Sequence, residues 1–110
     1  MNRKEIGNAG ERLAGEMLER QGYRILERNY RCFYGEIDLI AEKNNKVAFV
    51  EVKTRLTDSC GDGRSAVDSK KRRRIHNAAG YYLSNTTTHF KDIDFQVVEI
   101  AVTHMTGLEF

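Results

Sequence analysis

Several features that mark membrane, secreted and zinc-binding proteins are scarce or absent in this sequence. No apolar run approaches the ~20 residues that a bilayer-spanning helix needs, and residues 1–17 carry charges where a signal peptide would be apolar. The two cysteines, Cys32 and Cys60, form no C-x-x-C motif, so neither a zinc site nor a disulfide framework is indicated. There is no proline to mark the ends of helices. We expect a soluble, cytoplasmic protein that has reduced thiols and contacts no membrane.

The charge of the chain is nearly balanced overall, but it is unevenly distributed. The 18 Lys and Arg residues oppose 16 Asp and Glu residues, and a net charge of +2 by itself decides nothing about nucleic-acid binding. Residues 69–90 contain no acid and include five consecutive cations, Lys70, Lys71, Arg72, Arg73 and Arg74. The sequence therefore predicts one locally basic region.

Length and hydrophobic patterning predict one α/β domain over residues 1–110. A chain of 110 residues, 40% of them hydrophobic, can bury a single core of one sheet and two or three helices. Apolar periodicity predicts a helix over 6–21, strands over 23–32, 36–42 and 46–55, a loop over 56–65, a helix over 65–84 capped by Ser65, and a largely buried strand over 93–103. A strand–helix–strand connection favours parallel pairing, so we expect the order αβββαβ, with helices flanking a mixed sheet.

The first predicted helix has an apolar stripe that includes Leu13, Ala14 and Leu18, and Gly22 follows it at the position of a C-terminal cap. Between the second and third predicted strands, Asn44 and Asn45 tolerate the positive φ of a two-residue hairpin turn. Such a turn fixes the register of the hairpin. It places three pairs on one buried apolar face: Ile37 with Val52, Leu39 with Val50, and Ala41 with Ala48.

The opposite face of this hairpin carries charged residues. The same register sets Asp38 against Glu51, and it sets Glu36 against Lys53. Two carboxylates directly opposite each other destabilise an ordinary sheet by up to ~1 kcal/mol. Their repulsion therefore has to be offset.

A divalent cation would offset this repulsion. Asp38 and Glu51 converge at strand spacing, and the backbone carbonyl of Val52 is a third oxygen, a donor set that suits Mg²⁺ or Mn²⁺. Lys53 shares the face of Glu51, where its ammonium can orient water or stabilise charge on a phosphoryl oxygen. The alternative is a solvated ladder of surface ion pairs.

Two segments of the hairpin, residues 35–41 (GEIDLIA) and 47–55 (VAFVEVKTR), resemble the YraN-like endonuclease-like family, which is related to Holliday junction resolvases. The similarity extends to residues 10–14 (GERLA) and to residues 66–68 and 70–73. It implies the restriction-endonuclease-like fold of the PD-(D/E)xK superfamily. Asp38 then matches the acid of the second strand, and Glu51 and Lys53 match the Glu-x-Lys motif. Glu11 matches the helix acid of the resolvases, while Ile37 stands in place of the motif's proline.

The resemblance implies a metal-dependent endonuclease acting on structured or branched DNA. Asp38 and Glu51 would bind Mg²⁺, for which Mn²⁺ can substitute, and Lys53 would act on the hydrolytic water or the scissile phosphate. Glu11 either supports the metal, directly or through water, or is a solvated helix acid. Glu36 is a candidate partner of Lys53.

Cations on either side of the predicted site are candidate DNA ligands, although such runs are commonly solvated surface. They are Arg55, Arg64, Lys70, Lys71, Arg72, Arg73 and Arg74. Cutting a four-way junction symmetrically requires a two-fold homodimer, because one domain supplies one site. The alternative function is a DNA-binding accessory protein of repair, recombination or uptake that cleaves little or not at all. RNA also stays open as a substrate.

Overall fold

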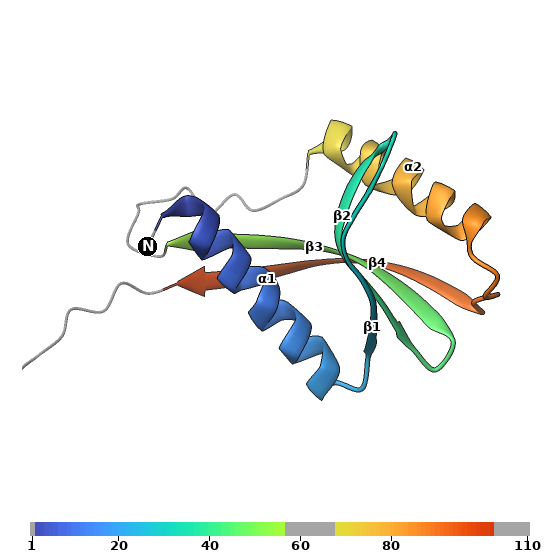
Figure 1. The fold of residues 1–110 in the computed structure, drawn as a ribbon, viewed down its shortest axis with the longest axis horizontal. Helices are drawn as coiled ribbons and strands as arrows, with labels where there is room; N and C mark the ends of the chain where they lie inside the picture. Colours follow the sequence, from blue (N-terminus) through green and yellow to red (C-terminus); the bar gives the residue numbers. More distant parts are fainter. Residues whose placement is uncertain (1, 57–67, 103–110) are drawn as a thin grey trace, which may run out of the picture.

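One four-stranded sheet, with a helix packed against each face, organises the chain (Figure 1). The computed structural model describes residues 2–56 and 68–102. Its elements are α1 (Arg3–Arg20), β1 (Arg24–Cys32), β2 (Gly35–Lys43), β3 (Lys46–Leu56), α2 (Ser69–Asn85) and β4 (Asp92–Val102). This is the predicted αβββαβ order, and the architecture matches a restriction-endonuclease-like fold. In the described ranges, neither helix is long and apolar enough to cross a membrane.

Helix α1 begins and ends with local capping contacts. The Asn2 side chain accepts the backbone N–H of Glu5, whose carboxylate accepts the N–H of Asn2, so two otherwise unpaired donors are satisfied. Past the last turn, Gly22 has a φ of +96°, as a glycine cap predicts. The expected apolar stripe is partly wrong, because Leu13 is 51% exposed while Ala14 and Leu18 are fully buried. The helix approaches the sheet through its small residues, which turns Leu13 towards solvent.

The β2–β3 hairpin has the predicted turn and the predicted register near that turn. Asn44 and Asn45 have φ values of 51° and 65°. Strand pairing runs from the turn to Leu39, which lies opposite Val50. Beyond this pair, the described ladder ends and β2 turns towards α2 (Figure 1).

The two faces of the sheet carry separate apolar cores. The core beneath α1 contains Leu39, Ala41, Ala48 and Val50, which confirms the predicted face for these four residues. Ile37 was predicted on the same face, and this prediction is wrong. Ile37 packs instead with residues of the second core, beneath α2. The reason is that β2 pairs with β3 only from Leu39 onward, two residues after Ile37.

Helix α2 starts later than the sequence predicts. Asp68, rather than Ser65, is its N-cap and accepts the backbone N–H of Lys71 at 2.7 Å. Ile75, Ala78 and Ala79 form the apolar stripe of α2 and are buried against the sheet. Ser65 and most of the loop predicted over 56–65 lie outside the described residues.

Strand β4 pairs in parallel with β3, which gives the predicted mixed sheet. The prediction that it is largely buried is wrong. Val98 is buried, but Ile93, Phe95 and Val97 are 52%, 40% and 51% exposed. The reason is the position of α2, which packs mainly on β2 and also on β1 and so leaves this face of β4 open.

Candidate active site

A pocket of about 300 Å³ lies where α1, β2, β3 and the first turn of α2 meet. It is lined by Gly7, Glu11, Glu36, Asp38, Glu51, Val52, Lys53, Thr54 and Lys71. Every residue predicted to act in catalysis or metal binding is among them. The pocket also contains Lys71, which the charge pattern predicted as a phosphate ligand outside the site.

Asp38 occupies the point where strand pairing stops. Its Oδ2 accepts the backbone N–H of Val52 at 2.7 Å, so a side chain replaces the next ladder partner of β3. Burial raises the pKa of Asp38 to about 7; the nearby Glu51 and Glu11 carboxylates add to the effect, and the Val52 hydrogen bond opposes it. The site therefore favours a neutral Asp38, or one that is compensated by a positive charge.

Glu51 is a buried acid in the middle of β3, with 6% of its surface exposed. Its Oε2 forms an ion pair with Nζ of Lys71, which reaches down from the first turn of α2. Burial by itself would lower the pKa of Lys71, but its hydrogen bond and attraction to Glu51 outweigh burial and raise the pKa. The ammonium group thus partly neutralises the acidic pocket.

Glu11 reaches the pocket because α1 packs very closely on β3. A Cβ built on Gly10 would lie 2.9 Å from Cβ of Thr54, so only glycine fits this contact without displacement. Burial raises the pKa of Glu11, as do the charges of Glu36 and Glu51, whereas a hydrogen bond with Asn29 lowers it. Glu11 therefore lines the same pocket as Asp38 and Glu51.

The sequence model of uncharacterised protein family UPF0102 matches residues 10–100. The chain belongs to the UPF0102 family. This is the YraN-like group that the sequence motifs indicate. Among its UPF0102 relatives, the protein of Syntrophomonas wolfei is 46% identical over 93% of this chain and 88% of its own. The Alkaliphilus metalliredigens protein is 43% identical over 90% and 87%, and the Clostridium perfringens strain 13 protein is 46% identical over 88% and 80%.

The predicted DNA ligands of this UPF0102 chain lie in different environments. Arg55 forms an ion pair with Glu99 of β4 at 3.1 Å, and Arg64 lies outside the described residues. Arg74 lies beside Gly35 and Glu36 at the end of the β1–β2 hairpin. Lys70, Arg72 and Arg73 are exposed on α2. The five consecutive cations therefore lie on more than one side of the helix.

The donors in the UPF0102 pocket have the chemistry that Mg²⁺ and Mn²⁺ prefer, namely carboxylate and carbonyl oxygens. Burial is the main reason that the pKa of Asp38 is raised, and the nearby Glu51 and Glu11 carboxylates add to the effect. Within the described residues, however, no three Asp, Glu, His or Cys side chains are arranged to share one ion. Lys71 is paired with Glu51, one of the carboxylates that such a set would include.

The contact between Lys71 and Glu51 is the feature of the site that sequence reasoning missed. The cationic run over residues 70–74 marked a basic region but not the member that enters the pocket. That member depends on where α2 begins and on how it packs on β2. Neither is encoded in the spacing of charges along the chain.

Proposed function

We propose that this protein is a metal-dependent endonuclease that hydrolyses phosphodiester bonds in structured or branched DNA. The observation that carries the proposal is the single pocket that gathers Asp38, Glu51, Lys53 and Glu11 from three elements. A partly buried acid with a strongly raised pKa in such a pocket is typical of a functional site. Structural stability alone gives no reason to bury these like charges together.

In the proposed site, Asp38, Glu51 and the Val52 carbonyl hold Mg²⁺, for which Mn²⁺ can substitute. Glu11 supports the ion directly or through a water molecule. A bound divalent ion would lower the pKa of water and stabilise the negative charge that develops on the phosphate. Binding would also neutralise the repulsion among the three carboxylates.

Lys53 is the proposed group that acts on the reacting atoms. It lies two residues after Glu51 on β3, so both side chains share one face and line the same pocket. Its ammonium would hold the attacking water in line with the scissile bond and stabilise the phosphoryl oxygens. The water oxygen forms a bond to phosphorus and releases a proton to the solvent. The bond from phosphorus to one ester oxygen breaks, and that oxygen takes up a proton from water. Glu36 also lines the pocket and forms an ion pair with Arg31, and its carboxylate would be a further partner for the Lys53 ammonium.

Cations around the pocket would hold the DNA backbone. Lys70, Arg72 and Arg73 extend from α2, and Arg74 lies near the hairpin end, so phosphates can be contacted on more than one side of the site. Such contacts provide affinity without sequence readout. Two copies of the chain would be required for symmetric cleavage of a four-way junction.

The proposal is tested by incubating labelled four-way junction, flap, duplex, single-stranded DNA and RNA with Mg²⁺ or Mn²⁺. Metal-dependent cutting should be lost, by 100-fold or more as an order of magnitude, in Lys53→Ala and in Asp38→Asn. Glu5→Gln, an exposed change on α1 outside the pocket, serves as the matched control. Cutting that survives both active-site changes would contradict the proposal.

One observation favours a second candidate, a DNA-binding accessory protein that does not cleave. Lys71 already compensates Glu51, so the pocket can be stable without an ion. Calorimetric titration with Mn²⁺ separates the two functions. The nuclease predicts metal binding that is lost in Asp38→Asn and strengthened in Lys71→Met, with Lys70→Met as the exposed control. Absence of Mn²⁺ binding in the wild type and in Lys71→Met would favour the accessory protein.

A further inference from the structure

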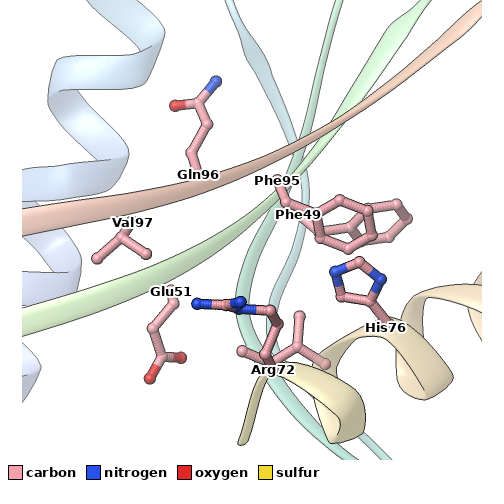
Figure 2. Close-up of a pocket in the computed structure, with 8 residues that line it drawn as sticks. Phe49, Glu51, Arg72, His76, Phe95, Gln96 and Val97 are labelled. Atoms are coloured by element: carbon pink, nitrogen blue, oxygen red, sulfur yellow. The ribbon is translucent and has the colours of Figure 1, made fainter. Parts of the chain in front are cut away.

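A second hollow, of about 320 Å³, lies on the α2 side of β3 and β4 (Figure 2). Phe49, Phe95 and Val97 lie along its sheet side, and His76 and Arg72 lie along its helix side. Glu51 lines this hollow and also lines the acidic pocket. The two hollows are therefore adjacent and share one residue.

The surface of the second hollow is aromatic and partly open to solvent. The rings of His76 and Phe95 are stacked, with centroids 4.1 Å apart and an interplanar angle of 4°. Phe95 also stacks on Phe49, at 5.5 Å and 29°. Phe95 is nevertheless 40% exposed and Val97 is 51% exposed. His76 and Phe49 both stack on Phe95, and the exposed parts of Phe95 and Val97 remain available for contact with another ring.

The aromatic surface lies close to the proposed reaction site. In the parallel register, Phe95 lies beside Phe49, and Val97 lies beside Glu51. Two residues along a strand span about 6.6 Å and neighbouring strands lie about 4.8 Å apart, so the backbone positions of Phe95 and Glu51 are separated by about 8 Å. This is the length of two to three stacked base steps at ~3.4 Å each. A nucleotide bound at the acidic pocket can therefore place a neighbouring base at Phe95.

We propose that the second hollow binds an unpaired nucleobase of the substrate strand, one or two nucleotides from the scissile phosphate. The inference rests on the proposed nuclease function and specifies its substrate. A nucleobase matches the hollow in three respects: it is flat, it stacks on aromatic rings, and its strand carries phosphates that the neighbouring Arg72 attracts. Because a paired base cannot reach the hollow, the site selects DNA with unpaired or unstacked bases, as at junctions, flaps and bulges.

The test measures binding in EDTA, so it requires no cleavage. The probes are a labelled duplex with one bulged 2-aminopurine and the same duplex with an abasic site in the bulge. The wild type should bind the 2-aminopurine probe about tenfold more tightly than the abasic probe, since stacking of one base contributes ~1–3 kcal/mol. Binding should also quench the fluorescence of the 2-aminopurine. Phe95→Ala should bind the two probes alike, and Phe95→Tyr should retain the preference.

Ile93 supplies a matched control for these variants. It is 52% exposed on the same face of β4 but does not line the hollow. Val97→Ser should reduce the preference for the 2-aminopurine probe, whereas Ile93→Ser should leave it unchanged. If Phe95→Ala fails to fold, the comparison of Val97→Ser with Ile93→Ser still tests the inference.

The remaining outcomes distinguish failure of the base site from failure of the proposed hydrolysis. Equal affinity of the wild type for both probes would show that the hollow binds no base. If light scattering then gave a dimer that Val97→Ser dissociates, the hollow would be an interface between two copies of the chain. A base preference without any metal-dependent cutting would support the base site and contradict the proposed hydrolysis. Metal-dependent cutting without a base preference would support the proposed hydrolysis and contradict the base site.

Discussion

Asp38 combines two roles that conflict at neutral pH. Its Oδ2 accepts the Val52 N–H, which completes the backbone pairing of β3, yet its partly buried carboxylate lies near Glu51 and Glu11. Burial and these neighbours raise its pKa from 3.8 to about 7, so the folded protein retains a proton that the unfolded chain releases. Folding stability must then fall as the pH rises between these two values.

The first prediction follows from this difference in proton binding. Without divalent metal, the contribution of Asp38 to folding stability should be most favourable below about pH 4. This contribution should be lost as the pH rises through about 7. Asp38→Asn keeps an oxygen acceptor for the Val52 N–H and should raise the free energy of unfolding by about 2 kcal/mol at pH 8. Urea denaturation from pH 4.5 to 8 measures this difference.

Glu36 provides the control for that experiment. Its side chain is 63% exposed and forms an ion pair with Arg31 at the surface, so Glu36→Gln should change stability by less than about 1 kcal/mol at either pH. A pH dependence in Asp38→Asn equal to that of the wild type would contradict the assignment of the raised pKa to Asp38.

At the residue scale, local rules predict much of this site. The Asn44-Asn45 turn fixes the register through Leu39 and Val50, and this register alone is enough to predict that Asp38 lies near Glu51. The same rules fail at the next pair, because the Asp38 side chain takes the Val52 N–H that the ladder would have used. A hydrogen bond between a side chain and a distant backbone group has no signature in strand periodicity.

At the element scale, α1 carries Glu11 to the pocket through the close contact of Gly10 with Thr54. Gly10→Ala should therefore destabilise the protein by about 1–3 kcal/mol, because the added methyl group forces the helix away from β3. Glu11 would move with the helix, so cutting should weaken as well. Thermal denaturation and the junction assay measure the two effects.

Gly7 is the matched glycine for this experiment. It lies one turn earlier on α1, and a Cβ built on it meets no atom within 4 Å. Gly7→Ala should leave stability unchanged or raise it by up to about 1 kcal/mol through helix propensity. If Gly7→Ala and Gly10→Ala destabilised the protein equally, the close contact at Gly10 would not explain the loss of stability.

Helix α2 gives the element-scale prediction for DNA binding. Lys70 and Arg73 are exposed in its first turns, near the pocket that Lys71 enters. For each cation that contacts a duplex phosphate, replacement by Gln should reduce the slope of log affinity against log salt by about 0.9. Fluorescence anisotropy at several salt concentrations tests this. Arg20→Gln, at the far end of α1, should leave the slope unchanged.

The exposure of β4 illustrates why whole elements are harder to place than to recognise. Residues 93–103 read as a buried strand because apolar and β-branched residues dominate them. The strand does form and pairs with β3, but α2 packs on β2 and β1. Composition reports what a strand can bury, whereas the position of a helix above the sheet depends on contacts along the whole chain.

At the scale of the whole molecule, the proposed cleavage of four-way junctions requires a dimer. One chain contributes one pocket of the proposed composition, and a four-way junction is resolved by two cuts on opposed strands. We expect light scattering to give twice the mass of one chain when the four-way junction is bound. A monomer on every DNA tested would exclude symmetric resolution and leave a nicking activity.

The order of strands in the sheet also bears on how fast the chain folds. Strands β1, β2 and β3 pair through short turns, whereas α2 and β4 join them only after a long segment closes. Short-range pairs cost less loop-closure entropy and form earlier. We therefore expect Asp38 and Glu51 to approach each other in the folding transition state before Lys71 reaches Glu51. The kinetic consequence is that Asp38→Asn should speed folding and leave the rate of unfolding nearly unchanged.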